Sequence, residues 1–146
     1  MRYLILVVLA ASVICVTGCG GGGGTPAGYN VTDGWVTTPD GLKYKYVKIG
    51  TGYAAADGQS LTVNYTGWLD DGTVFDSSLN EGREPLTFTL GRGDVIKGFD
   101  EGLKGARQGD VIDLIIPYSL GYGDQVHGPI PAYSTLHFEV EVLSIY

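Results

Sequence analysis

The alternation of apolar and polar residues predicts β-strands through most of the chain beyond residue 40. Segments 61–66, 86–90 and 136–142 alternate at a period of two, which is typical of strands with one buried and one solvated face. Segment 111–116 is apolar almost throughout, with Asp113 as the exception, as expected for a central strand. These four segments predict a domain rich in β-structure.

One short helix is expected in the same region. Apolar residues in segment 95–103 fall at positions i, i+1, i+4 and i+8, which form one stripe on a helix. Asp94 is expected to cap its beginning, and Gly105 is a stop signal beyond its end. Two glycines inside the segment each lower its intrinsic stability by roughly 1 kcal/mol relative to alanine, so burial against the sheet must hold it.

A further strand at 43–49 and a tight hairpin at Asp71-Gly72 complete the pattern. Five or six strands with one short helix predict an α+β domain whose antiparallel sheet curls over the helix. Gly91-Arg92-Gly93 lacks the third glycine of a dinucleotide-binding fingerprint and lies in no parallel strand–helix–strand unit. We therefore assign it no function.

The first residues are typical of an export signal. Arg2 supplies a positive charge, and the apolar segment 4–16 is shorter than the roughly 20 residues of a membrane-spanning helix. It ends at Val16-Thr17-Gly18-Cys19, which resembles the lipobox of bacterial lipoproteins, whose cysteine is acylated and becomes the mature N-terminus. The alternative is an ordinary secretory signal that happens to contain Cys19. Because Cys15 lies in the segment to be removed, no disulfide partner remains for Cys19.

These features divide the chain into three expected parts. Residues 1–18 are the lipoprotein signal peptide, residues 19–38 a flexible tether that begins with a glycine run, and residues 39–146 one folded domain. Trp35 is the apolar exception in the tether and a candidate for docking on the domain.

Charge and histidine content exclude several classes of function. The chain carries a net charge of −7, and removal of the signal peptide would take away one arginine and no acid, leaving eight basic and sixteen acidic residues, or −8. An acidic chain without basic clusters argues against nucleic-acid binding and against electrostatic docking to anionic lipids. His127 and His137 are the only histidines, and we find no further ligands at a spacing suited to a metal. We therefore expect no metal and no cofactor.

The candidate chemistry lies in aromatic residues and one carboxylate near turns and element ends. Tyr65 precedes the hairpin turn, Phe75 and Asp76 follow it, and Leu120-Gly121-Tyr122-Gly123 adds another aromatic group. Such groups can converge into a small apolar pocket with few polar atoms, the usual form of a site for a small ligand or a peptide. No serine, cysteine or histidine nucleophile accompanies them, which favours chemistry done by environment over covalent attack.

The order of these blocks resembles that of the FKBP-type peptidyl-prolyl cis–trans isomerases. The resemblance covers almost all of residues 40–146 and rests on many separate blocks, so it is more specific than any single motif. The matching blocks include Val63-Asn64-Tyr65-Thr66-Gly67, Phe75-Asp76-Ser77-Ser78, Val95-Ile96-Lys97-Gly98-Phe99, Leu120-Gly121-Tyr122-Gly123, Ile130-Pro131 and the segment 136–143.

The resemblance implies a half-barrel of five or six antiparallel strands wrapped around the helix, with a proline-binding pocket between them. It implies catalytic roles for Tyr65, Asp76 and Tyr122, with the backbone N–H of the residue at 96 bound to a substrate carbonyl. The apolar residues that it places in the pocket, or at its rim and wall, are Phe75, Leu86, Phe88, Val95, Ile96, Phe99, Ile130, Leu136 and Phe138.

Three features depart from the family pattern. The pocket floor, usually tryptophan, is Phe99, and Leu86 replaces an aromatic residue of the rim. Because both positions remain apolar, these changes bear more on affinity for the macrolide tacrolimus than on isomerase activity. Segment 124–132 differs from the usual loop, which bears on substrate preference.

Together these observations predict a lipid-anchored prolyl isomerase that assists protein folding in the bacterial cell envelope. Its expected partners are proline-containing segments of unfolded envelope proteins, tacrolimus-like macrolides, and a membrane reached through lipidated Cys19. The expected location is the periplasmic face, at the outer membrane in a Gram-negative cell. We expect a monomer, because no dimerising helical extension precedes Pro39. The alternative is a non-catalytic module or chaperone that has the same fold and binds proline-containing segments.

Overall fold

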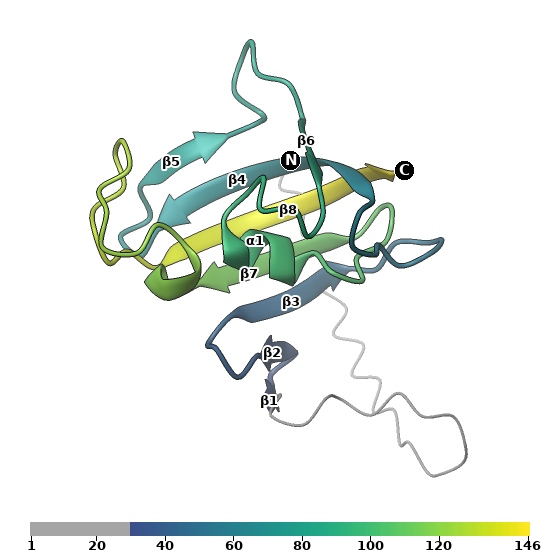
Figure 1. Cartoon of the computed structure of the whole chain (residues 1–146), viewed down its shortest axis with the longest axis horizontal. Coiled ribbons are helices and arrows are strands. Elements are labelled where there is room, and N and C mark those ends of the chain that lie inside the picture. Colours follow the sequence, from purple (N-terminus) through teal and green to yellow (C-terminus); the bar gives the residue numbers. More distant parts are fainter. Residues whose placement is uncertain (1–29) are drawn as a thin grey trace, which may run out of the picture.

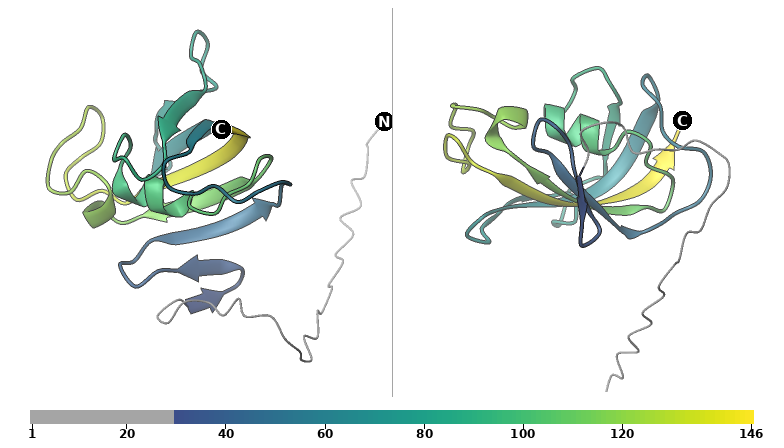
Figure 2. Two further views of the ribbon diagram at one scale, coloured as in Figure 1. Left: turned by 45° about the vertical axis from the view of Figure 1, so that its right-hand side comes forward. Right: turned by 90° about the horizontal axis from the view of Figure 1, so that it is seen from below.

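The computed structural model describes residues 30–146, which form one antiparallel sheet and a short helix, α1 (Lys97–Gly102) (Figure 1). Seven strands follow one another in the order β1-β2-β3-β7-β8-β4-β5, and β6 pairs with β4 off this path. The sheet curves around α1 and is open, because its end strands β1 and β5 do not pair with each other (Figure 2). The strands are β1 (Asn30–Thr32), β2 (Trp35–Thr37), β3 (Lys43–Lys48), β4 (Ser60–Leu69), β5 (Val74–Ser77), β6 (Leu86–Thr89), β7 (Val111–Ile116) and β8 (Leu136–Ile145).

This architecture confirms the predicted α+β class, an antiparallel sheet wrapped around one short helix. The strand count differs: residues 30–146 contain eight strands, whereas the sequence predicts five or six. Two of the additional strands, β1 and β2, lie in the expected tether. They form a hairpin in which Thr32 pairs with Trp35, and Thr37 of this hairpin pairs with Lys43 of β3. Residues 30–37 therefore extend the sheet, and Trp35 is half-buried in it.

The other predictions for the N-terminal part lie outside the described residues. These are the signal peptide 1–18, the acylated Cys19 and the glycine run of the tether, so all three stay predictions. Within residues 30–146, no helix has both the length and the apolar character needed to cross a membrane.

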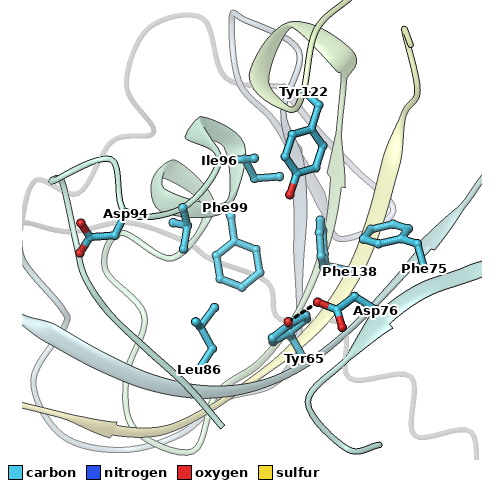
Figure 3. Close-up of a pocket in the computed structure, with 10 residues that line it drawn as sticks. Tyr65, Phe75, Asp76, Leu86, Asp94, Ile96, Phe99, Tyr122 and Phe138 are labelled. Atoms are coloured by element: carbon cyan, nitrogen blue, oxygen red, sulfur yellow. Dashed lines mark hydrogen bonds between the residues drawn. The ribbon is translucent and has the colours of Figure 1, made fainter. Parts of the chain in front are cut away.

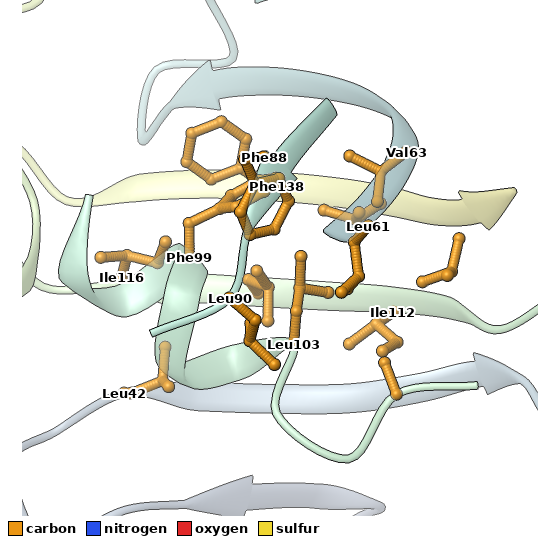
Figure 4. Close-up of a cluster of buried hydrophobic side chains, with 14 of the residues drawn as sticks. Leu42, Leu61, Val63, Phe88, Leu90, Phe99, Leu103, Ile112, Ile116 and Phe138 are labelled. Atoms are coloured by element: carbon orange, nitrogen blue, oxygen red, sulfur yellow. The ribbon is translucent and has the colours of Figure 1, made fainter. Parts of the chain in front are cut away.

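The ten-residue strands β4 and β8 form the centre of the sheet and pair from Leu61↔Ile145 to Leu69↔Leu136. Their alternation follows the sequence pattern, since Leu61 and Val63 are fully buried whereas their neighbours are partly exposed. Strand β7 pairs with the other side of β8 and buries every second residue as well. The apolar residues of these strands meet beneath α1 in one cluster (Figure 4).

Helix α1 lies on the concave face because two of its residues have no side chain. A Cβ atom at Gly98 would stand 2.4 Å from Cγ2 of Ile116, and one at Gly102 would stand 2.6 Å from Cδ2 of Leu114. Phe99 on the same helix is 3% exposed. The helix is therefore held by burial, as the sequence predicts.

The beginning of α1 differs from the prediction. The helix starts at Lys97, its N-cap is Ile96, and no side chain caps it. Asp94 instead accepts a hydrogen bond from the backbone N–H of Thr89 at 2.9 Å, which ties the loop before the helix to the end of β6. Capping by Asp94 is therefore wrong, because this carboxylate is bound to the backbone of a strand.

Candidate active site

The hairpin of β4 and β5 brings together the two polar residues at the base of the site. Gly72 forms the turn with φ +85°, a conformation that favours glycine, and its N–H donates to the carbonyl of Leu69 at 2.9 Å. This turn places Asp76 of β5 beside Tyr65 of β4, whose hydroxyl donates to Oδ2 of Asp76 at 2.5 Å. The predicted hairpin is therefore present, and it brings Tyr65 and Asp76 into direct hydrogen-bond contact.

Asp76 is also held by groups that the sequence analysis did not find. Nη2 of Arg83, in the loop between β5 and β6, donates to Oδ1 of Asp76 at 3.1 Å, and the N–H of Ser77 donates to the same oxygen at 2.9 Å. Arg83 is seven positions beyond Asp76, and no local pattern indicates that the loop folds back over the strand. Both carboxylate oxygens are therefore occupied.

Five aromatic rings pack against one another in the apolar body of the site and directly behind it. Phe99 contacts the edges or faces of Tyr65, Phe88 and Phe138, with ring centroids 6.1, 5.7 and 5.3 Å away. Phe75 meets Phe138 at 5.5 Å in an edge-to-face arrangement. Such arrangements suit the charge distribution of aromatic rings. The rings thus support one another at defined angles.

A glycine in β4 makes room for two of these rings. A Cβ atom at Gly67 would stand 2.6 Å from Phe75 and 2.7 Å from Phe138. The side of β4 that faces the pocket is therefore left open for aromatic side chains from β5 and β8. This explains physically why glycine follows Tyr65-Thr66 in the motif.

These side chains enclose a cavity of about 170 Å³ at the open side of the sheet (Figure 3). Tyr122 lies after the 3-10 helix η1 (Tyr118–Leu120) and directs its hydroxyl toward the cavity from the side opposite Tyr65. Among the described residues that line the cavity, none is a serine, cysteine or histidine. The lining residues are Tyr65, Phe75, Asp76, Leu86, Asp94, Val95, Ile96, Phe99, Tyr122 and Phe138.

Both tyrosine hydroxyls of the site are hydrogen-bond donors at neutral pH. Burial raises the pKa of Tyr65, and its hydrogen bond to Asp76 raises that pKa further. Burial also raises the pKa of Tyr122, with a smaller contribution from the charge of Asp76. Because an unperturbed tyrosine already titrates near pKa ~10, neither hydroxyl is ionised under physiological conditions.

Most of the predicted pocket residues meet in this cavity, but three do not line it. Phe88, Ile130 and Leu136 are 4%, 3% and 0% exposed and belong to the core. Phe88 supports Phe99 from behind rather than contacting the cavity. Asp94 lines the cavity although the sequence analysis gave it only a capping role; its place directly before Val95-Ile96 was the available signal. The catalytic roles of Tyr65, Asp76 and Tyr122 stay predictions.

Comparison with known proteins agrees with this geometry. Residues 52–143 match the family model of the FKBP-type peptidyl-prolyl cis–trans isomerases. The chain is 50% identical over 107 residues to an FK506-binding protein of Neisseria meningitidis serogroup B, covering 73% of this chain and 97% of that protein. It is 52% identical over 89 residues to the human peptidyl-prolyl cis–trans isomerase FKBP2, covering 60% of this chain and 62% of that protein.

Solved structures give the same result. FkpA from Escherichia coli superposes with a TM-score of 0.71 at 45% identity, over 78% of this chain and 52% of that one, so the present chain spans about half of FkpA. AtFKBP13 superposes with a TM-score of 0.72 at 37% identity, over 77% of this chain and 98% of that one. The chain therefore belongs to the FKBP-type peptidyl-prolyl cis–trans isomerase family, and it is an enzyme of that class.

Proposed function

We propose that this isomerase accelerates rotation about X–Pro bonds of proteins that fold in the bacterial cell envelope, where the lipid on Cys19 holds it to a membrane. The observation that carries the catalytic part is the aromatic cavity, with its tyrosine hydroxyls on opposite sides and no nucleophile among the described lining residues. The envelope part is supported by the export signal, the lipobox-like sequence and the glycine run of the N-terminal segment.

The chemistry follows from the peptide bond. Rotation is slow because amide resonance must be lost, a barrier of roughly 18–20 kcal/mol, and an X–Pro bond interconverts unaided in tens to hundreds of seconds. The planar amide is charge-separated and well hydrated, whereas the twisted amide has less charge separation. A pocket that removes water from the amide therefore disfavours the planar state relative to the twisted one.

The aromatic residues supply this environment. Phe99 forms the floor under a proline ring, with Phe138 and Phe75 on one side and Val95 on another. These side chains are held by mutual packing, so the cavity exists before the substrate enters. Binding of the ring then brings the preceding amide out of water without a large rearrangement of the protein.

The polar groups orient the substrate chain. Ile96 lines the cavity, and its N–H donates no backbone hydrogen bond among residues 30–146, so we assign this N–H to a substrate carbonyl. The hydroxyl of Tyr122 donates a second hydrogen bond to the substrate backbone. Asp76 fixes the hydroxyl of Tyr65, because both of its carboxylate oxygens are already occupied.

A protease-coupled isomerisation assay on a series of short X–Pro peptides tests the catalytic part. The mature protein is expected to accelerate cis-to-trans conversion of these peptides well above the spontaneous rate. Absence of acceleration, together with retained binding of the same peptides, would replace the enzyme with a proline-segment binding module. Fractionation of cells that express the full chain tests the envelope part, since the protein is expected in the membrane fraction.

A further inference from the structure

An exposed histidine covers one face of the Tyr122 ring. The rings of Tyr122 and His127 are nearly parallel, with an interplanar angle of 7° and centroids 4.1 Å apart. Tyr122 lines the cavity, whereas His127 does not, so the histidine touches the tyrosine from outside the site. His127 is exposed, so no enclosing core dictates where its ring lies.

The backbone of His127 is anchored to the core. Its N–H donates to the carbonyl of Ile130 at 3.0 Å, and the N–H of Ile130 donates back to the carbonyl of His127 at 2.9 Å. Ile130 is 3% exposed and packs in the hydrophobic cluster. This tight bridge fixes the position from which the imidazole extends over Tyr122.

The turn that carries Tyr122 is fixed on its other side. The N–H of Gly123 donates to the carbonyl of Tyr118 at 2.9 Å, and the carbonyl of Gly123 accepts from the N–H of Tyr133 at 2.8 Å. Tyr133 takes the left-handed conformation, φ +59°, which non-glycine residues adopt only when their surroundings hold them there. Because the backbone of the turn is held, Tyr122 can move mainly by rotation of its side chain. His127 covers one face of the ring that would rotate.

From this arrangement we propose that His127 is a positioning residue of the isomerase, which holds the Tyr122 hydroxyl at the angle needed to bind the substrate backbone. The inference rests on the proposed role of the pocket in binding an X–Pro segment. It assigns a purpose to part of the 124–132 loop, the segment in which the sequence departs from its family. Because correct orientation of a bound group contributes directly to rate, loss of the stacking ring lowers efficiency without removing any contact to substrate.

The chain contains a matched control for this stack. His137 of β8 also lies against an aromatic ring, that of Trp68, with centroids 5.9 Å apart and an interplanar angle of 15°. It donates to or accepts from Asp70 at 2.6 Å. Its neighbours Leu136 and Phe138 point into the core, so His137 is on the outer face of the sheet, away from the cavity.

The test measures kcat and KM on one X–Pro peptide for five variants of the mature protein. His127→Ala is expected to lower kcat/KM about three- to tenfold, the amount that an aromatic stacking pair contributes. His127→Phe keeps a flat ring and should stay within about twofold of the wild type, as should the control His137→Ala. In a Tyr122→Phe background, which lacks the hydroxyl, the further change His127→Ala should have no added effect. Thermal melting of each variant checks that the fold is retained.

The kinetics would overturn the inference in three cases: wild-type efficiency in His127→Ala, an equal loss in His127→Phe, or a loss that simply adds to that of Tyr122→Phe. An additive loss with a lowered melting temperature would show a purely structural role. A wild-type protein without turnover would contradict the proposed function instead. The same variants are then compared in their affinity for the peptide by calorimetry, where equal affinities of His127→Ala and wild type would again overturn the inference.

Discussion

At the scale of a single residue, both carboxylate oxygens of Asp76 accept hydrogen bonds from groups of the protein itself. One oxygen accepts from Tyr65, and the other accepts from Arg83 and from the N–H of Ser77. In the proposed function, Asp76 therefore acts by holding the hydroxyl of Tyr65 in place.

Asp76→Ala is expected to lower kcat/KM roughly tenfold or more, because a hydrogen bond to a charged group contributes about 1.5–3 kcal/mol. The fold should persist, since Asp76 is only half-buried. Peptide isomerisation and thermal melting of the variant check both statements. Asp70→Ala is the matched control, because Asp70 also binds a ring side chain, that of His137, but lies outside the cavity. Unchanged efficiency in Asp76→Ala would remove the polar pair from the site.

Phe99→Trp is expected to increase tacrolimus affinity about fivefold. A larger floor adds some tens of Å² of apolar contact to a rigid ligand, about 1 kcal/mol at roughly 25 cal/mol per Å². Because Phe99 is packed by three aromatic rings, the larger side chain should also lower stability by about 1–3 kcal/mol. Calorimetry measures the affinity, and Phe88→Trp serves as the control, since Phe88 lies behind the floor. Equal or weaker binding by the Phe99 variant would show that this residue is not the floor.

Asp113 gives the molecule a pH-dependent stability. Burial in β7 raises the pKa of this carboxyl above its usual range, against a weaker opposite influence of Lys45. The folded state therefore binds the proton more tightly than the unfolded state, and the contribution of Asp113 to stability is lost as pH rises through the folded pKa. Asp113→Asn should consequently stabilise the protein at pH ~7 and have no such effect below pH ~3, where the carboxyl is protonated in both states. Urea unfolding at the two pH values measures this; a gain of equal size at both would exclude titration as its cause.

At the scale of elements, the alternation of apolar and polar residues predicts the strands that have one buried face. The alternation in β4 and β8 identifies strands because every second residue must enter the core, and Leu61 and Val63 do so. The β1–β2 hairpin was missed because its strands are three residues each and stand among threonine, glycine and proline, a composition typical of linkers. Trp35 was the one signal that these residues pack.

Gly98→Ala is expected to destabilise the protein by about 1–3 kcal/mol, the usual effect of overpacking. Alanine is the better helix former by roughly 1 kcal/mol, so helix propensity alone would give the opposite sign. The added methyl would stand 2.4 Å from Cγ2 of Ile116, so the helix or this side chain would have to shift. Lys97→Ala, an exposed neighbour in the same turn, should change stability by less than about 0.5 kcal/mol. Denaturant unfolding compares the two; a stabilised Gly98 variant would refute close packing of α1 on β7.

At the scale of the whole molecule, the site draws on elements that are distant in sequence. Most of the residues that the family resemblance assigns to the pocket line the cavity, because the resemblance rests on many blocks in one order. Arg83 was missed because its contact to Asp76 depends on how a loop folds back. Phe88, expected at the rim or wall of the pocket, does not line the cavity and is 4% exposed, since a strand pattern shows which face a residue is on but not how deeply it lies. The depth at which a residue is buried and the path that a loop takes both depend on how the strands assemble into the sheet.

In the proposed function, the link between this domain and a membrane is the lipid on Cys19. Cys19→Ala is expected to move the protein from the membrane fraction to the soluble fraction without changing the melting temperature of the domain. Stable anchoring needs more than one acyl chain, which lipoprotein modification of Cys19 would supply, and the acidic chain offers no basic cluster that would hold it to anionic lipid instead. Fractionation of cells after a high-salt wash, with the unaltered chain as reference and peptide isomerisation as the check on folding, measures both properties. If the active Cys19→Ala protein still sediments with membranes after that wash, anchoring does not depend on Cys19, and the lipoprotein assignment fails.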